Sequence, residues 1–148
     1  MEISDILLMK KATFPGVYAS LDHIRVFFGT AAREIGMEES QVYDVQLAVD
    51  EAATNIIDHA YGGEGNGEIE CSYQVIHDGL KIMMRDFGLP FEPDEVDAPD
   101  VECDVCDRKN GGLGLYFMRS LMDTVEFSFN GHGGNQLTMT VTKKVGNK

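Results

Sequence analysis

The feature that most constrains the fold is the segment from Asp44 to Tyr61, where apolar and polar residues recur at helical spacing. Projected at about 100° per residue, the segment separates into one apolar arc and one polar arc. The apolar arc contains Val42, Val45, Val49, Ala52, Ala53, Ile56 and Ala60, and the polar arc contains Asp44, Glu51, Asn55 and Asp58. The pattern predicts one amphipathic helix, with Ser40 as its N-cap and Gly62-Gly63 at its end.

Glu51 and Asn55 are four residues apart and therefore lie one turn apart on the polar face of this helix. A carboxylate next to a carboxamide can hold a hydrated cation. The same spacing is common on an ordinary solvated helix face, and both interpretations stay open from spacing alone.

The remaining chain alternates between strand and helix patterns with short turns. Strands are predicted at 6–14, 68–76, 80–86, 125–130 and 136–144, and further helices at 20–36 and 112–123. His77-Asp78-Gly79 is a strong hairpin signal. The order predicts one domain over residues 1–148 with an α+β fold, a two-layer sandwich of helices on one face of a mostly antiparallel mixed sheet.

Charge and composition exclude several classes of function. The formal net charge of -13 argues against binding to duplex nucleic acid or to anionic membrane surfaces. The apolar runs are too short for a membrane span, and the N-terminus is acidic first and basic last, unlike a signal peptide. Three cysteines, an odd number, without a secretory context indicate a reducing cytoplasm.

Two further segments carry candidate chemistry. Asp86 ends a predicted strand and Gly88 follows it; the aspartate forms a turn or accepts a hydrogen bond from an adenine amino group. The run from Gly111 to Gly114 leads into a helix, where free N–H groups form a phosphate site or a plain capped loop. Arg108 and Lys109 precede this turn and could add charged contacts.

Residues 92–110 contain many acidic side chains and interrupt the periodic pattern. A loop this long is usually functional or disordered, and we expect a mobile lid over a site. Cys103 and Cys106 lie within it. They are ordinary loop cysteines, a redox switch, or the basis of a third class of function, a thiol- or metal-sensing regulator.

Taken together and in this order, the three motif segments resemble the GHKL (histidine-kinase-like) ATPase superfamily. The chain is most similar to the bacterial anti-sigma factor serine-protein kinases, through EAATNIIDHAY, Asp86-x-Gly-x-Pro-Phe and GGLGLYFMRSLMD. The resemblance covers nearly the whole chain. Pro90 stands where the wider superfamily favours a second glycine, which narrows the match to this branch.

The resemblance implies a Bergerat-type ATP-binding fold with ATP and Mg²⁺ as cofactors. It assigns Asn55 as the Mg²⁺ ligand, Glu51 as the general base, Asp86 as the adenine reader and Gly88 as the residue that admits the base. The other implied nucleotide contacts are Arg108, Lys109, Gly111, Gly112, Leu113, Gly114, Leu115 and Thr138. Leu115 also belongs to an apolar run that is expected to pack in the core.

The implied function is that of an ATP-dependent serine/threonine protein kinase. It would phosphorylate an anti-anti-sigma antagonist of the STAS type and sequester a sigma factor, as a cytoplasmic homodimer without direct contact to nucleic acid or membrane. The alternative is an ATP-binding regulatory module that binds partners with little or no kinase activity.

Overall fold

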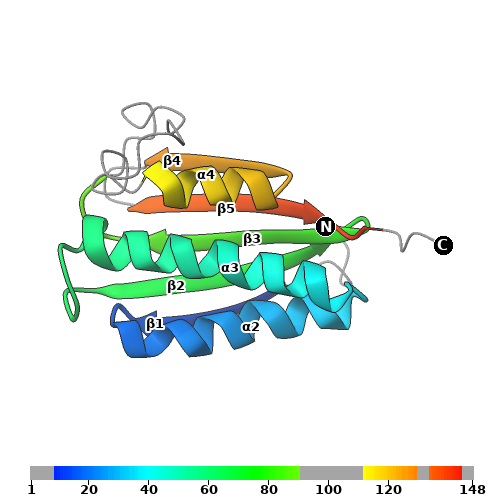
Figure 1. Cartoon of the computed structure of the whole chain (residues 1–148). Coiled ribbons are helices and arrows are strands. Elements are labelled where there is room, and N and C mark those ends of the chain that lie inside the picture. Colours follow the sequence, from blue (N-terminus) through cyan, green and yellow to red (C-terminus); the bar gives the residue numbers. More distant parts are fainter. Residues whose placement is uncertain (1–8, 91–111, 130–133, 145–148) are drawn as a thin grey trace.

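Five strands form one sheet, ordered β1-β2-β3-β5-β4 (Figure 1). The computed structural model describes residues 9–90, 112–129 and 134–144. The strands are β1 (Met9–Pro15), β2 (Glu68–Ile76), β3 (Gly79–Asp86), β4 (Thr124–Phe129) and β5 (Asn135–Thr142). All four pairings are antiparallel, so the described strands contain no parallel pair of the kind that a mixed sheet would have. The α+β prediction is confirmed.

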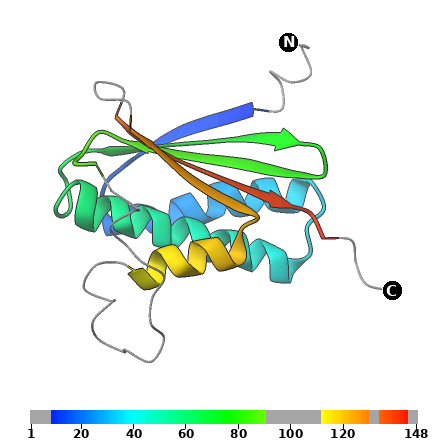
Figure 2. The same ribbon diagram turned by 90° about the horizontal axis from the view of Figure 1, so that it is seen from above.

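The helices that the structure describes all lie on one face of this sheet, which gives the two predicted layers (Figure 2). They are the 3₁₀ turn η1 (Tyr18–Ser20), α2 (Leu21–Glu34), α3 (Glu39–Asn55), the π-helical turn η2 (Ile56–Ala60) and α4 (Gly112–Leu121). In β2, buried Ile69 and Cys71 alternate with the more exposed Glu70 and Ser72, as predicted for a strand with one covered face. The core lies between the two layers.

The central helix differs from its prediction at both ends. It begins at Glu39, so Ser40 lies inside the first turn, and Glu38 occupies the N-cap position without a side-chain cap hydrogen bond. After Asn55 the helix widens into η2, where the N–H of Tyr61 donates to the carbonyl of Ile56 at 2.9 Å. Such π turns occur mostly as single turns and frequently at functional sites. The other described boundaries lie within one or two residues of the predicted ones, except the start of β1, which is Met9 and not Ile6; residues 1–8 lie outside the described ranges.

The helix layer depends on complete burial of its inward side chains. Ile24 of α2 has no exposed surface, whereas Val26 on the same helix is 62% exposed. We expect Ile24→Ala to lower the free energy of unfolding by about 2–5 kcal/mol, because it removes buried methyl groups and leaves a cavity. Val26→Ala is the matched control and should change stability by less than about 0.5 kcal/mol. Urea unfolding of both variants measures the difference, and equal midpoints would contradict this packing.

Candidate functional site

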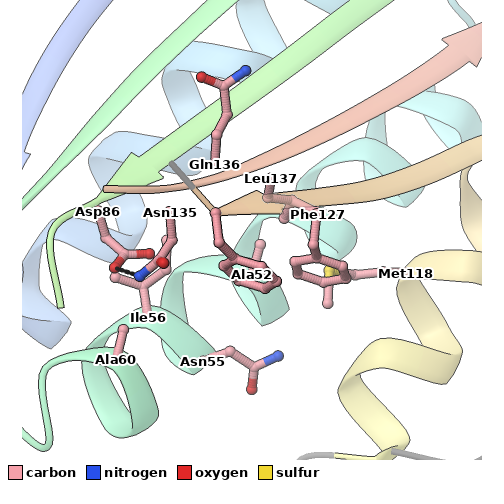
Figure 3. A pocket seen from close by; sticks show the side chains of 11 residues that line it. Ala52, Asn55, Ile56, Ala60, Asp86, Met118, Phe127, Asn135, Gln136 and Leu137 are labelled. Carbon is pink, nitrogen blue, oxygen red and sulfur yellow. Dashed lines mark hydrogen bonds between the residues drawn. The ribbon is translucent and has the colours of Figure 1, made fainter. Parts of the chain in front are cut away.

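A pocket lies at the end of the molecule where α3 and β3 end and where α4 and β5 begin (Figure 1). It contains about 440 Å³ of space, including the part open to solvent. Most of its walls are apolar, with polar side chains at a few points (Figure 3). The lining residues are Ala52, Asn55, Ile56, Ala60, Asp86, Met118, Phe127, Phe129, Asn135, Gln136 and Leu137.

Asp86 is the main polar group on the sheet side of the pocket. It is the last residue of β3 and only 6% exposed. Its Oδ1 accepts hydrogen bonds at 2.9 Å from the N–H of Gly88 and from Nδ2 of Asn135, the second of which is drawn in Figure 3. Burial raises the pKa of Asp86, and these two hydrogen bonds lower that pKa in part. Since both bonds end on Oδ1, Oδ2 has no hydrogen-bond partner among the described residues and is available to a ligand.

Gly88 holds the end of β3 against the end of the central helix. A Cβ built at Gly88 would overlap the carbonyl group of Ala60. The next residue, Leu89, donates its N–H to the same Ala60 carbonyl at 2.8 Å. Glycine at position 88 therefore lets the backbone after β3 come close to η2. This contact places Asp86 near the helix that carries Asn55.

Asn55 lines the pocket on the helix side, as the last residue of α3 (Figure 3). Glu51 is half-buried one turn earlier and does not itself line the pocket. Burial, and secondly the neighbouring carboxylate of Asp50, raise the pKa of Glu51. Asp50 in turn accepts a hydrogen bond from Arg25. Across the described ranges no three His, Cys, Asp or Glu side chains are grouped as a metal site.

The structure does not bring Thr138 to this pocket. Thr138 lies on β5 between the buried Leu137 and Met139, so its side chain belongs to the opposite face of the sheet. There its hydroxyl accepts a hydrogen bond from Gln136 at 3.2 Å.

Sequence reasoning missed Asn135, the residue of β5 that does contact Asp86. Asn135 pairs directly with Asp86 across the β3–β5 ladder. Pairing the last strand with β3 residue by residue, starting from Asp86, could have found Asn135.

Helix α4 contributes a wall and an N-terminus to this end of the molecule. Leu115 is buried in the core, and Met118 lines the pocket. Gly112, Leu113 and Gly114 form the first turn of α4, which begins at the same end of the molecule where α3 finishes (Figure 1). The predicted contacts Arg108, Lys109 and Gly111, the predicted lid 92–110 and the cysteines at 103 and 106 lie outside the described residues.

Comparison with solved structures supports this fold. The chain is similar to the RsbU and RsbW domains of Rv1364c from Mycobacterium tuberculosis, with a TM-score of 0.63 and 18% identity; the match covers 90% of this chain and 32% of that chain. It is also similar to the catalytic domain of histidine kinase ThkA, with a TM-score of 0.55 and 14% identity, covering 90% and 96% of the two chains. In the parts that the structure describes, no helix has the length and apolar character needed to cross a bilayer.

Sequence comparison gives stronger matches. The histidine kinase-like ATPase domain family matches residues 14–141. The serine-protein kinase RsbW of Bacillus subtilis is 34% identical over 121 residues, covering 79% of this chain and 74% of that protein. RsbW of Bacillus pumilus is 33% identical over 148 residues, covering 96% and 87%. RsbW of Listeria monocytogenes is 32% identical over 135 residues, covering 88% and 82%. The chain therefore belongs to the histidine kinase-like ATPase domain family, in the branch of the RsbW serine-protein kinases.

Proposed function

We propose that this chain is an ATP-dependent serine-protein kinase whose nucleotide binds in the pocket between Asp86 and Asn55. The observation that carries the proposal is the buried Asp86 carboxylate, which keeps Oδ2 available to a ligand in a pocket that Asn55 closes on the helix side. Its relatives over most of the chain are named serine-protein kinases.

The chemistry of the pocket fits an adenine nucleotide. The apolar side chains of Ile56, Phe127 and Leu137 can cover the faces of a planar base. Asp86 offers an acceptor where adenine has an amino group and guanine has a carbonyl oxygen. A buried acceptor opposite a carbonyl oxygen would leave both groups unpaired, at a cost of about 1–3 kcal/mol.

The phosphates and Mg²⁺ belong, in this proposal, between Asn55 and the start of α4. Mg²⁺ keeps several waters and takes few protein oxygens, so the carboxamide oxygen of Asn55 is sufficient as a side-chain ligand. The first turn of α4 can supply free N–H groups to phosphate oxygens. Arg108, Lys109 and Gly111 remain predicted phosphate contacts, and residues 92–110 remain a predicted lid.

Glu51 is the proposed general base. Mg·ATP, when bound, supplies the phosphoryl group that is transferred. Glu51 would accept the proton of the acceptor serine hydroxyl, and its raised pKa makes it a stronger base than an exposed glutamate. Glu51 lies one turn before Asn55 on α3, so the acceptor serine would have to reach the polar face of α3 that carries both side chains.

The wider role follows from the resemblance to the anti-sigma kinases. The substrate would be a serine on a STAS-type anti-anti-sigma protein, and the second partner a sigma factor that the kinase sequesters. A homodimer in the cytoplasm, built from the single domain 1–148, completes the proposal.

Asp86→Asn tests the choice of base. The variant can keep its oxygen toward Asn135 and Gly88, so its NH₂ group would face the adenine amino group, donor against donor. We expect ATP affinity to fall about tenfold or more and the preference for ATP over GTP to shrink. The fold should be unharmed, because burial of the ionised Asp86 already opposes folding at neutral pH. Calorimetry with both nucleotides measures this, and equal wild-type affinity for ATP and GTP would remove the assignment.

Glu51→Gln and Asn55→Ala separate catalysis from binding. Glu51→Gln should leave ATP affinity within a few-fold and slow phosphate transfer by roughly 10²-fold or more, because the base acts mainly in the reaction. Asn55→Ala should lower both Mg²⁺-dependent ATP affinity and transfer. Asp44→Asn, the same loss of charge two turns earlier on α3, is the control. Normal transfer by Glu51→Gln to an anti-anti-sigma protein would show that Glu51 is not the base.

The acidic limb of the transfer rate should report the pKa of Glu51. A base must be ionised, so the rate falls as pH drops through this raised pKa, at a higher pH than for an ordinary glutamate. Asp50→Asn removes one of the two causes of the shift and should move the limb to lower pH. A limb that does not move, measured with the same substrate, would mean that another group controls it.

A further inference from the structure

The side chain of Asn135 is more firmly oriented than any other amide at the pocket. It is 8% exposed, and its Nδ2 lies near three acceptors. Nδ2 donates to Oδ1 of Asp86 at 2.9 Å and to the carbonyls of Gly88 and Leu89, each at 3.1 Å. Gly134 makes this possible, because a Cβ there would overlap the carbonyl of Asp86. The start of β5 therefore lies tightly against the end of β3.

These contacts settle which way the amide points. The opposite orientation would put the oxygen of Asn135 against a carboxylate and two carbonyls, with no donor among them. The NH₂ group must therefore face Asp86 and the turn after it. The Oδ1 atom of Asn135 is directed away from these groups (Figure 3). Asn135 itself lines the pocket, and no described residue donates a hydrogen bond to its Oδ1.

We propose that Asn135 is a specificity-determining residue, which holds Asp86 with Oδ2 toward the pocket and presents its own Oδ1 as a second acceptor beside it. The two acceptors suit a base with an exocyclic amino group, which has two hydrogens to donate. A base with a carbonyl or a hydrogen at that position leaves the acceptors unpaired. This inference rests on the proposed ATP site. It assigns recognition of the amino group of the base to Asp86 and Asn135 together.

The experiment compares two nucleotides that differ only in the amino group. Mg·ATP and the Mg complex of purine riboside triphosphate, which has hydrogen in place of the amino group, share every phosphate contact. The ratio of their affinities therefore isolates the reading of the base. We expect wild type to prefer ATP by about tenfold or more. Asn135→Leu should bring this ratio to within about threefold of unity, while affinity for the purine analogue changes only a few-fold.

Two further variants keep the test independent of folding. Asn135→Ser retains a hydroxyl that can donate to Asp86 but has no amide oxygen, so its ratio should lie between those of wild type and Asn135→Leu. Thr140→Val is the control, because Thr140 lies on the same strand with its side chain on the opposite face, hydrogen-bonded to Thr124 at 2.6 Å. It should keep the wild-type ratio.

A pH series supplies a readout that a purely structural role would not move. Asn135 is one of two donors that lower the pKa of Asp86 against the effect of burial. Without it the pKa rises further, so Asp86 becomes protonated at a higher pH and turns a donor toward the amino group. The other groups at Asp86 are the Gly88 N–H and the Tyr61 phenol, whose own pKa is raised by burial. In Asn135→Leu any remaining preference for ATP should therefore weaken as pH falls, earlier than in wild type.

The outcomes are separable. If Asn135→Leu weakens both nucleotides equally, or leaves the ratio and its pH dependence at wild-type values, Asn135 only supports the fold and the inference is overturned. If wild type binds neither nucleotide, the proposed function itself fails. If wild type binds both equally well, the site does not read the amino group, and the inference fails while nucleotide binding stands.

Discussion

The site depends on one backbone contact, between the carbonyl of Ala60 at the end of η2 and the turn after β3. Leu89 donates its N–H to this carbonyl at 2.8 Å, and Gly88 lies so close to it that a side chain would not fit. The contact joins the two layers at the end where the pocket opens. It fixes the distance between the sheet, which carries Asp86, and the helix, which carries Asn55. A substitution at Gly88 would therefore act on both walls together.

Tyr61 makes further hydrogen bonds at the same junction between the helix layer and the sheet. Its hydroxyl accepts a hydrogen bond from the N–H of Phe87 at 3.0 Å and donates to the carbonyl of Glu68 at 2.5 Å. One phenol thus links the end of the central helix to the start of β2 and to the end of β3. The π turn η2 contributes as well, because Ala60 is its last residue and Tyr61 directly follows it. The helix prediction ran straight through this segment, since apolar spacing does not distinguish an α turn from a π turn.

Much of the fold could be predicted from the periodicity of the sequence, whereas the site could be predicted only in part. Strand alternation and helix spacing gave the two layers, and the positions of Asn55 and Asp86 at the ends of their elements placed both residues at the pocket. Asn135 was missed and Thr138 was chosen instead, because the position of a residue on a sheet depends on strand register. Register is set by pairing between distant segments, here Asp86 with Asn135, and a local pattern does not contain it. The roles of Arg108, Lys109 and Gly111 stay predictions, because these residues lie outside the described ranges.

The two carboxylates of the proposed mechanism have different roles, one as a hydrogen-bond acceptor and one as a proton acceptor, and their surroundings differ. Burial raises the pKa of both Asp86 and Glu51. At Asp86 two hydrogen bonds offset part of this effect and so favour the ionised form, which is the acceptor that the proposal needs. At Glu51 a neighbouring carboxylate adds to it, which favours a group that takes up a proton. Ionisation of these two side chains lowers the free energy of unfolding at neutral pH, because the folded state binds their protons more tightly than the unfolded chain does. A ligand that donates to Asp86 would return part of that free energy, so the bound nucleotide would stabilise the end of the sheet that recognises it.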